Sequence, residues 1–181
     1  SSGSVTFTAA DIATSADFAW SVFAADMDGD GDMDILSASA NDNTIAWYEN
    51  DGNANPTWTA DDITTSAASA TSVFAADMDG DGDMDIVSAS QGDDTIAWYE
   101  NDGNANPTWT KADIATSADN PWSVFAADMD GDGDMDILSA SIFDNTIAWY
   151  ENDGNANPSW AAVNIDTSAR SARSVFAADM D

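Results

Sequence analysis

A nine-residue stretch with five aspartates carries most of the chemistry that this sequence offers. It reads Asp-Met-Asp-Gly-Asp-Gly-Asp-Met-Asp from Asp26 to Asp34, and it recurs unchanged at residues 77–85 and 128–136. Carboxylates at alternate positions supply several hard oxygen ligands, and the glycine at the sixth position permits the sharp turn that winds them around one cation. The spacing therefore predicts three sites for a divalent metal ion.

Calcium is the cation that these loops favour, about one ion for each complete loop and three in the chain. Magnesium fits less well, because it prefers a tight octahedron with several retained waters. At the seventh position we expect the backbone carbonyl to bind while the side chain faces water. The expected metal-binding residues are Asp26, Asp28, Asp30, Asp32, Asp34, Asp77, Asp79, Asp81, Asp83, Asp85, Asp128, Asp130, Asp132, Asp134 and Asp136.

Two other interpretations of the loop are weaker. An EF-hand requires an acid at position 12, but Ser37 stands there, and a strand rather than a helix is expected to follow. A solvated acidic turn without a metal would place five carboxylates close together, and each near pair would cost on the order of 1 kcal/mol. The metal-binding interpretation is therefore preferred.

The composition excludes several classes of function. The formal net charge is −31, from 34 acidic and 3 basic residues, so nucleic acids and anionic membrane surfaces would be repelled. The absence of Cys and His removes disulfides, thiol catalysis and ordinary zinc sites. No apolar run is long enough for membrane insertion. The acid pairs that glycoside chemistry needs are committed to metal, so we expect no enzyme.

The chain is built from repeats of 51 residues, counted between Asp26, Asp77, Asp128 and Asp179. The first unit predicts four short strands and no helix, because runs rich in Val, Ile, Phe, Trp, Tyr and Thr are separated by turn residues. A lone unit of this size cannot bury its aromatic residues, so each sheet should be covered on both faces by neighbouring units. We therefore expect an all-β fold of β-propeller blades with four antiparallel strands each. The four strands are predicted at residues 21–25, 34–39, 44–49 and 57–63.

The repeat divides the chain into three complete blades with one strand at each end. Blade 1 is predicted at residues 21–71, blade 2 at 72–122 and blade 3 at 123–173. Residues 1–20 resemble the fourth strand of a preceding blade with its inter-blade loop, and residues 174–181 the first strand of a truncated next blade. Such an arc has open edges, which invite pairing with further repeats or with another copy.

Two segments of each unit resemble a known family, the FG-GAP or VCBS-type repeat. They are residues 22–36 and 45–52, with their equivalents in the next two units. The resemblance implies the calcium-binding blade of integrin alpha-chain propellers and of many secreted bacterial proteins, with the loop between first and second strands and commonly seven blades. Phe23-Ala24 and Ser37-Ala38-Ser39 replace the landmarks that name the family, so integrin-like ligand binding is not implied.

Two functions fit these observations. The first is a non-enzymatic, extracellular, calcium-binding module with a structural or adhesive role, or one that self-assembles into rings or filaments through open blade edges. The alternative is a carbohydrate-binding accessory module of a secreted protein. Under it, Trp20 and Trp122 stack on sugar rings, whereas otherwise they cap the apolar edge of the next blade. The Asn-rich segment 50–56 is either a turn or a second contact with a cation or a sugar.

Overall fold

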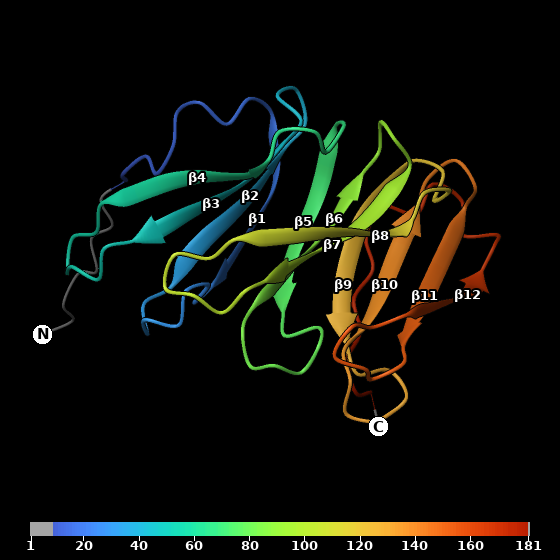
Figure 1. Ribbon diagram of the computed structural model, residues 1–181. Helices are drawn as coiled ribbons and strands as arrows, with labels where there is room; N and C mark the ends of the chain where they lie inside the picture. Colours follow the sequence, from blue (N-terminus) through green and yellow to red (C-terminus); the bar gives the residue numbers. More distant parts are fainter. Residues whose placement is uncertain (1–8, 181) are drawn as a thin grey trace, which may run out of the picture.

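The computed structural model describes residues 9–180 and is all-β (Figure 1). The strands of these residues form three four-stranded antiparallel sheets, each in simple sequence order. This arrangement confirms the predicted blades, here numbered 1 to 3 along the chain. The strands are β1 (Ala19–Ala25), β2 (Asp34–Ser39), β3 (Thr44–Asn50) and β4 (Trp58–Thr64); β5 (Ala70–Ala76), β6 (Asp85–Ser90), β7 (Thr95–Asn101) and β8 (Trp109–Ala115); β9 (Pro121–Ala127), β10 (Asp136–Ser141), β11 (Thr146–Asn152) and β12 (Trp160–Asp166).

The strand bounds agree with the expected ones to within two residues, because turn chemistry marks them clearly. β2 matches its prediction, and β1 begins two residues earlier than expected. The tight turn between the second and third strands needs a residue with positive φ, and Asn43, Asp94 and Asn145 occupy it at 57–58°. Asn and Asp tolerate this left-handed conformation better than other residues with a side chain.

Two apolar cores lie at the boundaries between blades. One joins blade 1 to blade 2 through residues such as Trp47 and Ile86, and the other joins blade 2 to blade 3. Blade 2 is therefore covered on both faces, as expected. The outer faces of blades 1 and 3 are not: Val22 is 70% exposed, whereas its equivalent Val73 is 4% exposed. The expectation of two covered faces is wrong for these two sheets, since residues 9–180 place a neighbour on one side of each.

The inner strands of successive blades are linked by a repeated hydrogen bond and a row of rings. The Val73 N–H donates to the Ser21 hydroxyl oxygen at 3.3 Å, and the same bond recurs one and two repeats later. The rings of Phe23, Phe74, Phe125 and Phe176 lie 4.5–4.8 Å apart in succession.

The ends of the chain behave differently from each other. Residues 174–180 form no strand, but they keep the inner-strand contacts of Val175 and Phe176 with blade 3. The predicted fourth-strand segment at the start lies mainly outside the described residues, and residues 9–12 have no regular strand. Within residues 9–180, no helix is long and apolar enough to cross a membrane.

Candidate metal centre

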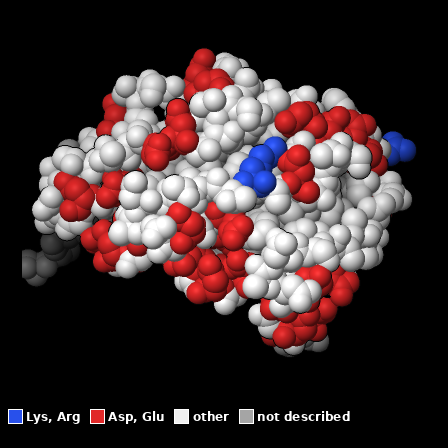
Figure 2. All heavy atoms as spheres, in the orientation of Figure 1, with Lys and Arg blue, Asp and Glu red and all other residues white. Residues whose placement is uncertain are grey.

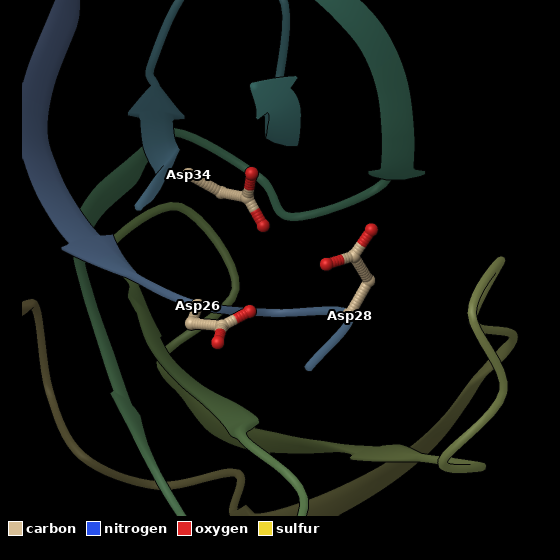
Figure 3. A group of neighbouring side chains, drawn as sticks. All are labelled: Asp26, Asp28 and Asp34. Atoms are coloured by element: carbon tan, nitrogen blue, oxygen red, sulfur yellow. The ribbon is translucent and has the colours of Figure 1, made fainter. Parts of the chain in front are cut away.

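The first aspartate loop gathers three carboxylates around one point (Figure 3). Asp26 follows β1, Asp34 begins β2 and Asp28 comes from the loop between them, and one oxygen of each lies within 4.8 Å of the others. The second loop repeats the group with Asp77, Asp79 and Asp85. The third gathers a different triplet, Asp128, Asp130 and Asp132. The structure thus brings three predicted ligands together in each loop.

The backbone of the loop is held in its curved form by its own side chains. Gly29 and Gly31 have φ of 74° and 96°, a region that residues with a Cβ rarely adopt. The Gly31 N–H donates to Asp26 Oδ2 at 2.9 Å, and the Asp30 N–H donates to Asp28 Oδ1 at 3.2 Å. These bonds fix the positions of the two carboxylates, so the oxygens that could bind a cation are already close together.

The donor set fits a hard cation. Asp26 Oδ1 is buried and has no hydrogen-bond partner among the described residues, although it lies beside two further carboxylates. A buried carboxylate oxygen without a donor is costly, and neighbouring negative charges add to that cost. A divalent ion bound by all-oxygen ligands removes both costs, and calcium accepts such a set in flexible geometry.

The aspartate at the ninth position of the loop also has a structural role that does not require metal. Asp85 is 1% exposed, and its two oxygens accept the Asn101 N–H at 2.8 Å and the Met78 N–H at 3.0 Å. Asp34 and Asp136 make the equivalent pairs of bonds. This carboxylate therefore fastens the loop to the end of the third strand of its own blade.

A second set of hydrogen bonds joins neighbouring blades. The Asn101 side-chain amide donates to the carbonyl oxygens of Met84, in its own loop, and of Met27, in the loop of blade 1, at 3.0 and 2.9 Å. Asn152 repeats this between blades 3 and 2. The sequence analysis placed these asparagines in a segment that is either a turn or a second contact with a cation or a sugar. The signal that identifies them is an Asn that ends the Trp-Tyr-Glu-Asn run of every unit.

The aspartates at the seventh position of each loop lie differently from expectation. Asp32, Asp83 and Asp134 are outside the three carboxylate groups, and they are half-buried rather than turned to water. The Asp32 carboxylate lies against Gly52 of the loop between β3 and β4, where an added Cβ would collide with it. Gly52 also has φ of 68°. Asp30 and Asp81 are likewise outside their groups, and so is Asp136 in the third loop.

Comparison with known proteins identifies the repeat. Residues 1–37, 26–88 and 77–139 each match the FG-GAP-like repeat, and together they cover most of the chain. The chain belongs to the FG-GAP-like repeat family. No curated protein matches it.

One solved structure with a similar fold is that of an Agrocybe aegerita lectin, described as specifically recognising non-reducing terminal N-acetylglucosamine. The match has a TM-score of 0.54 at 20% sequence identity, and it covers 83% of the FG-GAP-like chain and 39% of the lectin chain. At this identity the likeness concerns the fold. The aligned region therefore spans about two-fifths of the lectin.

The repeats differ at the start of their inner strands, and there an aromatic cluster forms. The Trp20 and Trp122 rings are 5.0 Å apart, although they come from blades 1 and 3. They meet because the equivalent residue of blade 2 is the small, buried Thr71, which donates to the Pro121 carbonyl oxygen. Phe18 contacts Trp20, and the guanidinium of Arg173 lies 5.0 Å from the centre of the Trp122 ring.

Acidic groups set the expected pH dependence of the calcium-free FG-GAP-like chain. Burial raises the pKa of Asp85 to about 7, although its backbone N–H bonds act to lower it. The contribution of this group to stability is therefore complete below about pH 4, and it is lost as the pH rises through about 7. Hydrogen bonds from Thr108 and Ser159 lower the pKa of Asp102 and Asp153 to about 2, so their contribution is present above about pH 4 and lost as pH falls toward 2.

We therefore expect the melting temperature of the metal-free protein to peak near about pH 4, and to fall both toward pH 7 and toward pH 2. Thermal melts in metal-depleted buffers across this range check the prediction. A melting temperature that climbs steadily from pH 5 to pH 8 would contradict the role of Asp85.

Proposed function

We propose that this chain is a calcium-stabilised, non-enzymatic module that binds carbohydrate through the cluster of Phe18, Trp20 and Trp122. Aromatic faces and an adjacent guanidinium suit a sugar ring, which presents an apolar face and a rim of hydroxyl groups. The cluster is available to a ligand, since Phe18 is 57% and Trp20 44% exposed. The similarity of the fold to a lectin supports the same proposal.

The observation that carries the proposal is the conformation of Phe18. Its φ is 61°, and the equivalent residues of the other repeats, Ser69, Asn120 and Ser171, share this conformation at 50–58° but have smaller side chains. A bulky residue in this region is strained and gains little from packing here, because most of its side chain is exposed. Strain of this kind concentrates at functional sites, which favours a ligand-facing role over a core role.

In this proposal calcium supports the site from a distance. Trp20 lies near the start of β1 and Asp26 directly after its end, so the cluster and the first loop are at opposite ends of one strand. Calcium then holds the blades together rather than contacting the sugar. Extracellular modules bind calcium with dissociation constants of about 10⁻⁴–10⁻³ M, so we propose an extracellular location where the ion is plentiful.

Replacement of the two tryptophans tests carbohydrate binding. Trp20→Ala and Trp122→Ala are each expected to weaken binding to N-acetylglucosamine-terminated glycans by about tenfold or more, because stacking on a sugar is lost. Glycan arrays followed by calorimetric titration provide the measurement. Phe143→Ala is the matched control, since Phe143 is 68% exposed and lies outside the cluster. Unaltered glycan binding by both Trp variants would refute the proposed site.

Self-association is a second candidate function, favoured by the open face of blade 1. Val22 is 70% exposed there, whereas Val73 and Val124 are 4% and 5% exposed because blades 1 and 2 cover them. At the other side, Ile165 and Phe176 are 56% and 73% exposed. These two faces are equivalent to the two sides of the internal boundaries, so the blade 3 face of one copy can receive the blade 1 face of another once residues 174–180, which pack on blade 3, are displaced.

A measurement of mass in solution tests this candidate. We expect the average mass to rise with protein concentration in saturating calcium, and Val22→Glu to suppress the rise because it places a charge in the shared apolar boundary. Analytical ultracentrifugation over a wide concentration range gives the answer. A strict monomer at the highest concentration would exclude head-to-tail assembly.

A further inference from the structure

The aromatic cluster depends on a residue of blade 2 that carries no ring, Thr71. Successive repeats have Trp20, Thr71, Trp122 and Arg173 at this position. Thr71 is buried in β5, the strand that contacts both β1 and β9. Its small side chain leaves room for the Trp20 and Trp122 rings to meet across blade 2, at 5.0 Å.

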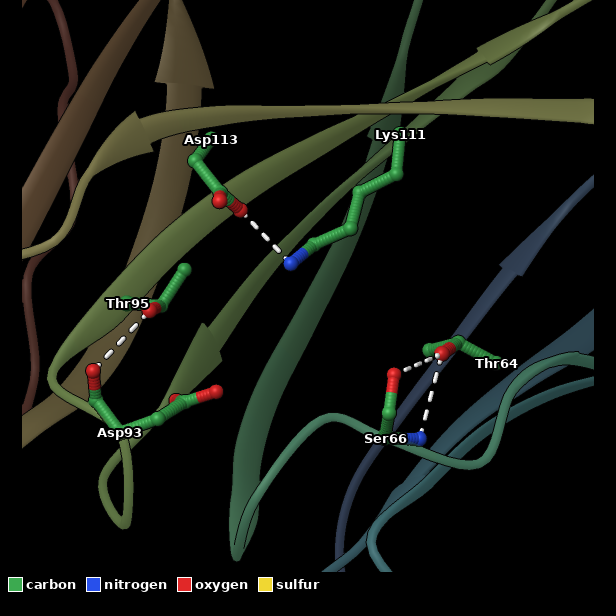
Figure 4. A network of polar contacts seen from close by, with 6 residues as sticks. All are labelled: Thr64, Ser66, Asp93, Thr95, Lys111 and Asp113. Atoms are coloured by element: carbon green, nitrogen blue, oxygen red, sulfur yellow. Dashed lines mark hydrogen bonds and ion pairs between the residues drawn. The ribbon is translucent and has the colours of Figure 1, made fainter.

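The hydroxyl group of Thr71 joins blade 2 to blade 3. It donates to the Pro121 carbonyl oxygen at 3.0 Å, and the Ala89 carbonyl oxygen of its own blade lies at 3.2 Å. A local bond of the same kind is that of Thr95, which donates to the carbonyl oxygen of Asp93, two residues away, at 3.0 Å (Figure 4). The Thr71 bond instead joins residues 50 apart in the sequence, so it fixes one blade against the next.

This bond restrains the backbone from which the Trp122 side chain extends. The carbonyl group of Pro121 and the backbone nitrogen of Trp122 belong to one rigid peptide plane. Proline also holds its own φ at about −65°, and Pro121 stands where blades 1 and 2 have Ala19 and Ala70. The half-buried Trp122 therefore has a backbone that is fixed from two directions.

Trp122 in turn supports the more exposed rings of the cluster. The Trp20 ring meets it edge to face, with an interplanar angle of 68°, and the Phe18 ring meets Trp20 at 87°. Both Trp20 and Phe18 are exposed, so they have few other contacts that could orient them. The arrangement of the exposed rings thus depends on Trp122, and through it on Thr71.

We propose that Thr71 is the positioning residue of the aromatic cluster. Its hydroxyl group sets the orientation of Trp122 through the Pro121 carbonyl, and Trp122 sets the orientation of Trp20. The effect on ligand affinity rests on the proposed carbohydrate function, whereas the effect on ring geometry does not. A ligand that contacts both tryptophans touches blades 1 and 3 at once, and blade 2 supplies the bond that aligns them.

Circular dichroism of the full chain in saturating calcium tests the positioning without any ligand. Two indole rings 5.0 Å apart give an exciton couplet that depends on their mutual orientation. The part of the couplet that is lost in Trp20→Phe belongs to this pair, and the part from Trp98 and Trp160 remains as a sign of an intact fold. Thr71→Val, which removes the hydroxyl group, is expected to lose most of the first part and to keep the second. Thr71→Ser, which retains a hydroxyl group, is expected to keep both.

Calorimetric titration with a trimer of N-acetylglucosamine measures the consequence for binding. A neutral probe is required because acidic side chains are spread over the surface, as the face in Figure 2 shows, and they attract cations without specificity. Thr71→Val is expected to weaken trimer binding about fivefold, which is the effect of one lost neutral hydrogen bond. Thr71→Ser is expected to bind like the natural chain.

Ser72→Ala is the matched control. Ser72 is the next residue of β5 and is also buried, and its hydroxyl oxygen accepts the Val124 N–H at 3.2 Å. Its replacement removes another bond between blades 2 and 3, but it is expected to leave the couplet unchanged. A Trp20 couplet that survives in Thr71→Val, or that Ser72→Ala abolishes equally, would overturn the proposal. A couplet that is lost in Thr71→Val while trimer binding is unchanged would support the positioning role and contradict the carbohydrate site.

Discussion

Removal of calcium is expected to lower the melting temperature of this chain by about 20 °C. At a calcium concentration of about 100 times the dissociation constant, each site adds about 2.7 kcal/mol to the free energy of unfolding. Three loops gather carboxylates, so together they contribute about 8 kcal/mol. In a chain of this length, about 2–4 °C is lost for each kcal/mol, which gives the expected shift.

Differential scanning calorimetry in calcium, and then in excess chelator, measures this effect. Magnesium at the same concentration is the control, and it should restore only a small part of the lost stability because it dehydrates reluctantly. Identical melting curves with and without chelator would show that the loops hold their carboxylates together by hydrogen bonds alone.

Asp85→Ala is expected to destabilise the chain by about 3 kcal/mol even in the absence of metal. The substitution leaves the Met78 and Asn101 N–H groups without their acceptor in a buried environment, and each unpaired donor costs about 1–3 kcal/mol. Denaturant unfolding in chelator measures the loss. Because the metal is absent from both proteins, the difference reports the structural role of Asp85 separately from any role as a ligand.

Asp81→Ala provides the matched control in the same loop. Asp81 is exposed and lies outside the carboxylate group, although its oxygen accepts the Asp83 N–H at 2.9 Å. Its replacement in chelator should cost less than about 1 kcal/mol, as for an exposed hydrogen bond. If both substitutions had equal effects, the distinction between the buried and exposed aspartates of the loop would be wrong.

The strands and the loops were predictable because local chemistry determines them. β2 starts at the aspartate that ends the metal loop and stops before a turn marked by Asn and Asp, so both bounds are visible in the sequence. The covered faces were harder to predict, since Val22 and Val73 have the same sequence neighbours and differ only in whether a blade precedes them. Burial is a property of the assembly rather than of the repeat.

The metal centre could likewise be predicted only in part from the sequence. Five alternate aspartates indicated a cation, but their spacing did not show that Asp85 would be buried among backbone N–H groups or that Asp32 would turn toward Gly52. These positions depend on how the loop between β3 and β4 folds over the metal loop. The contact between Trp20 and Trp122 was equally hidden, because it joins residues of two blades across a third.

The amide groups of Asn101 and Asn152 act as clasps between consecutive blades, and this has a consequence for how the array comes apart. An internal blade is clasped on both sides, whereas Asn50 donates only within its own blade among the described residues, to the Met33 carbonyl. Opening should therefore begin at the terminal blades and progress inward. Each blade added to such a row contributes one sheet and one Asn-mediated contact between blades, so the internal blades of a longer row become harder to unfold.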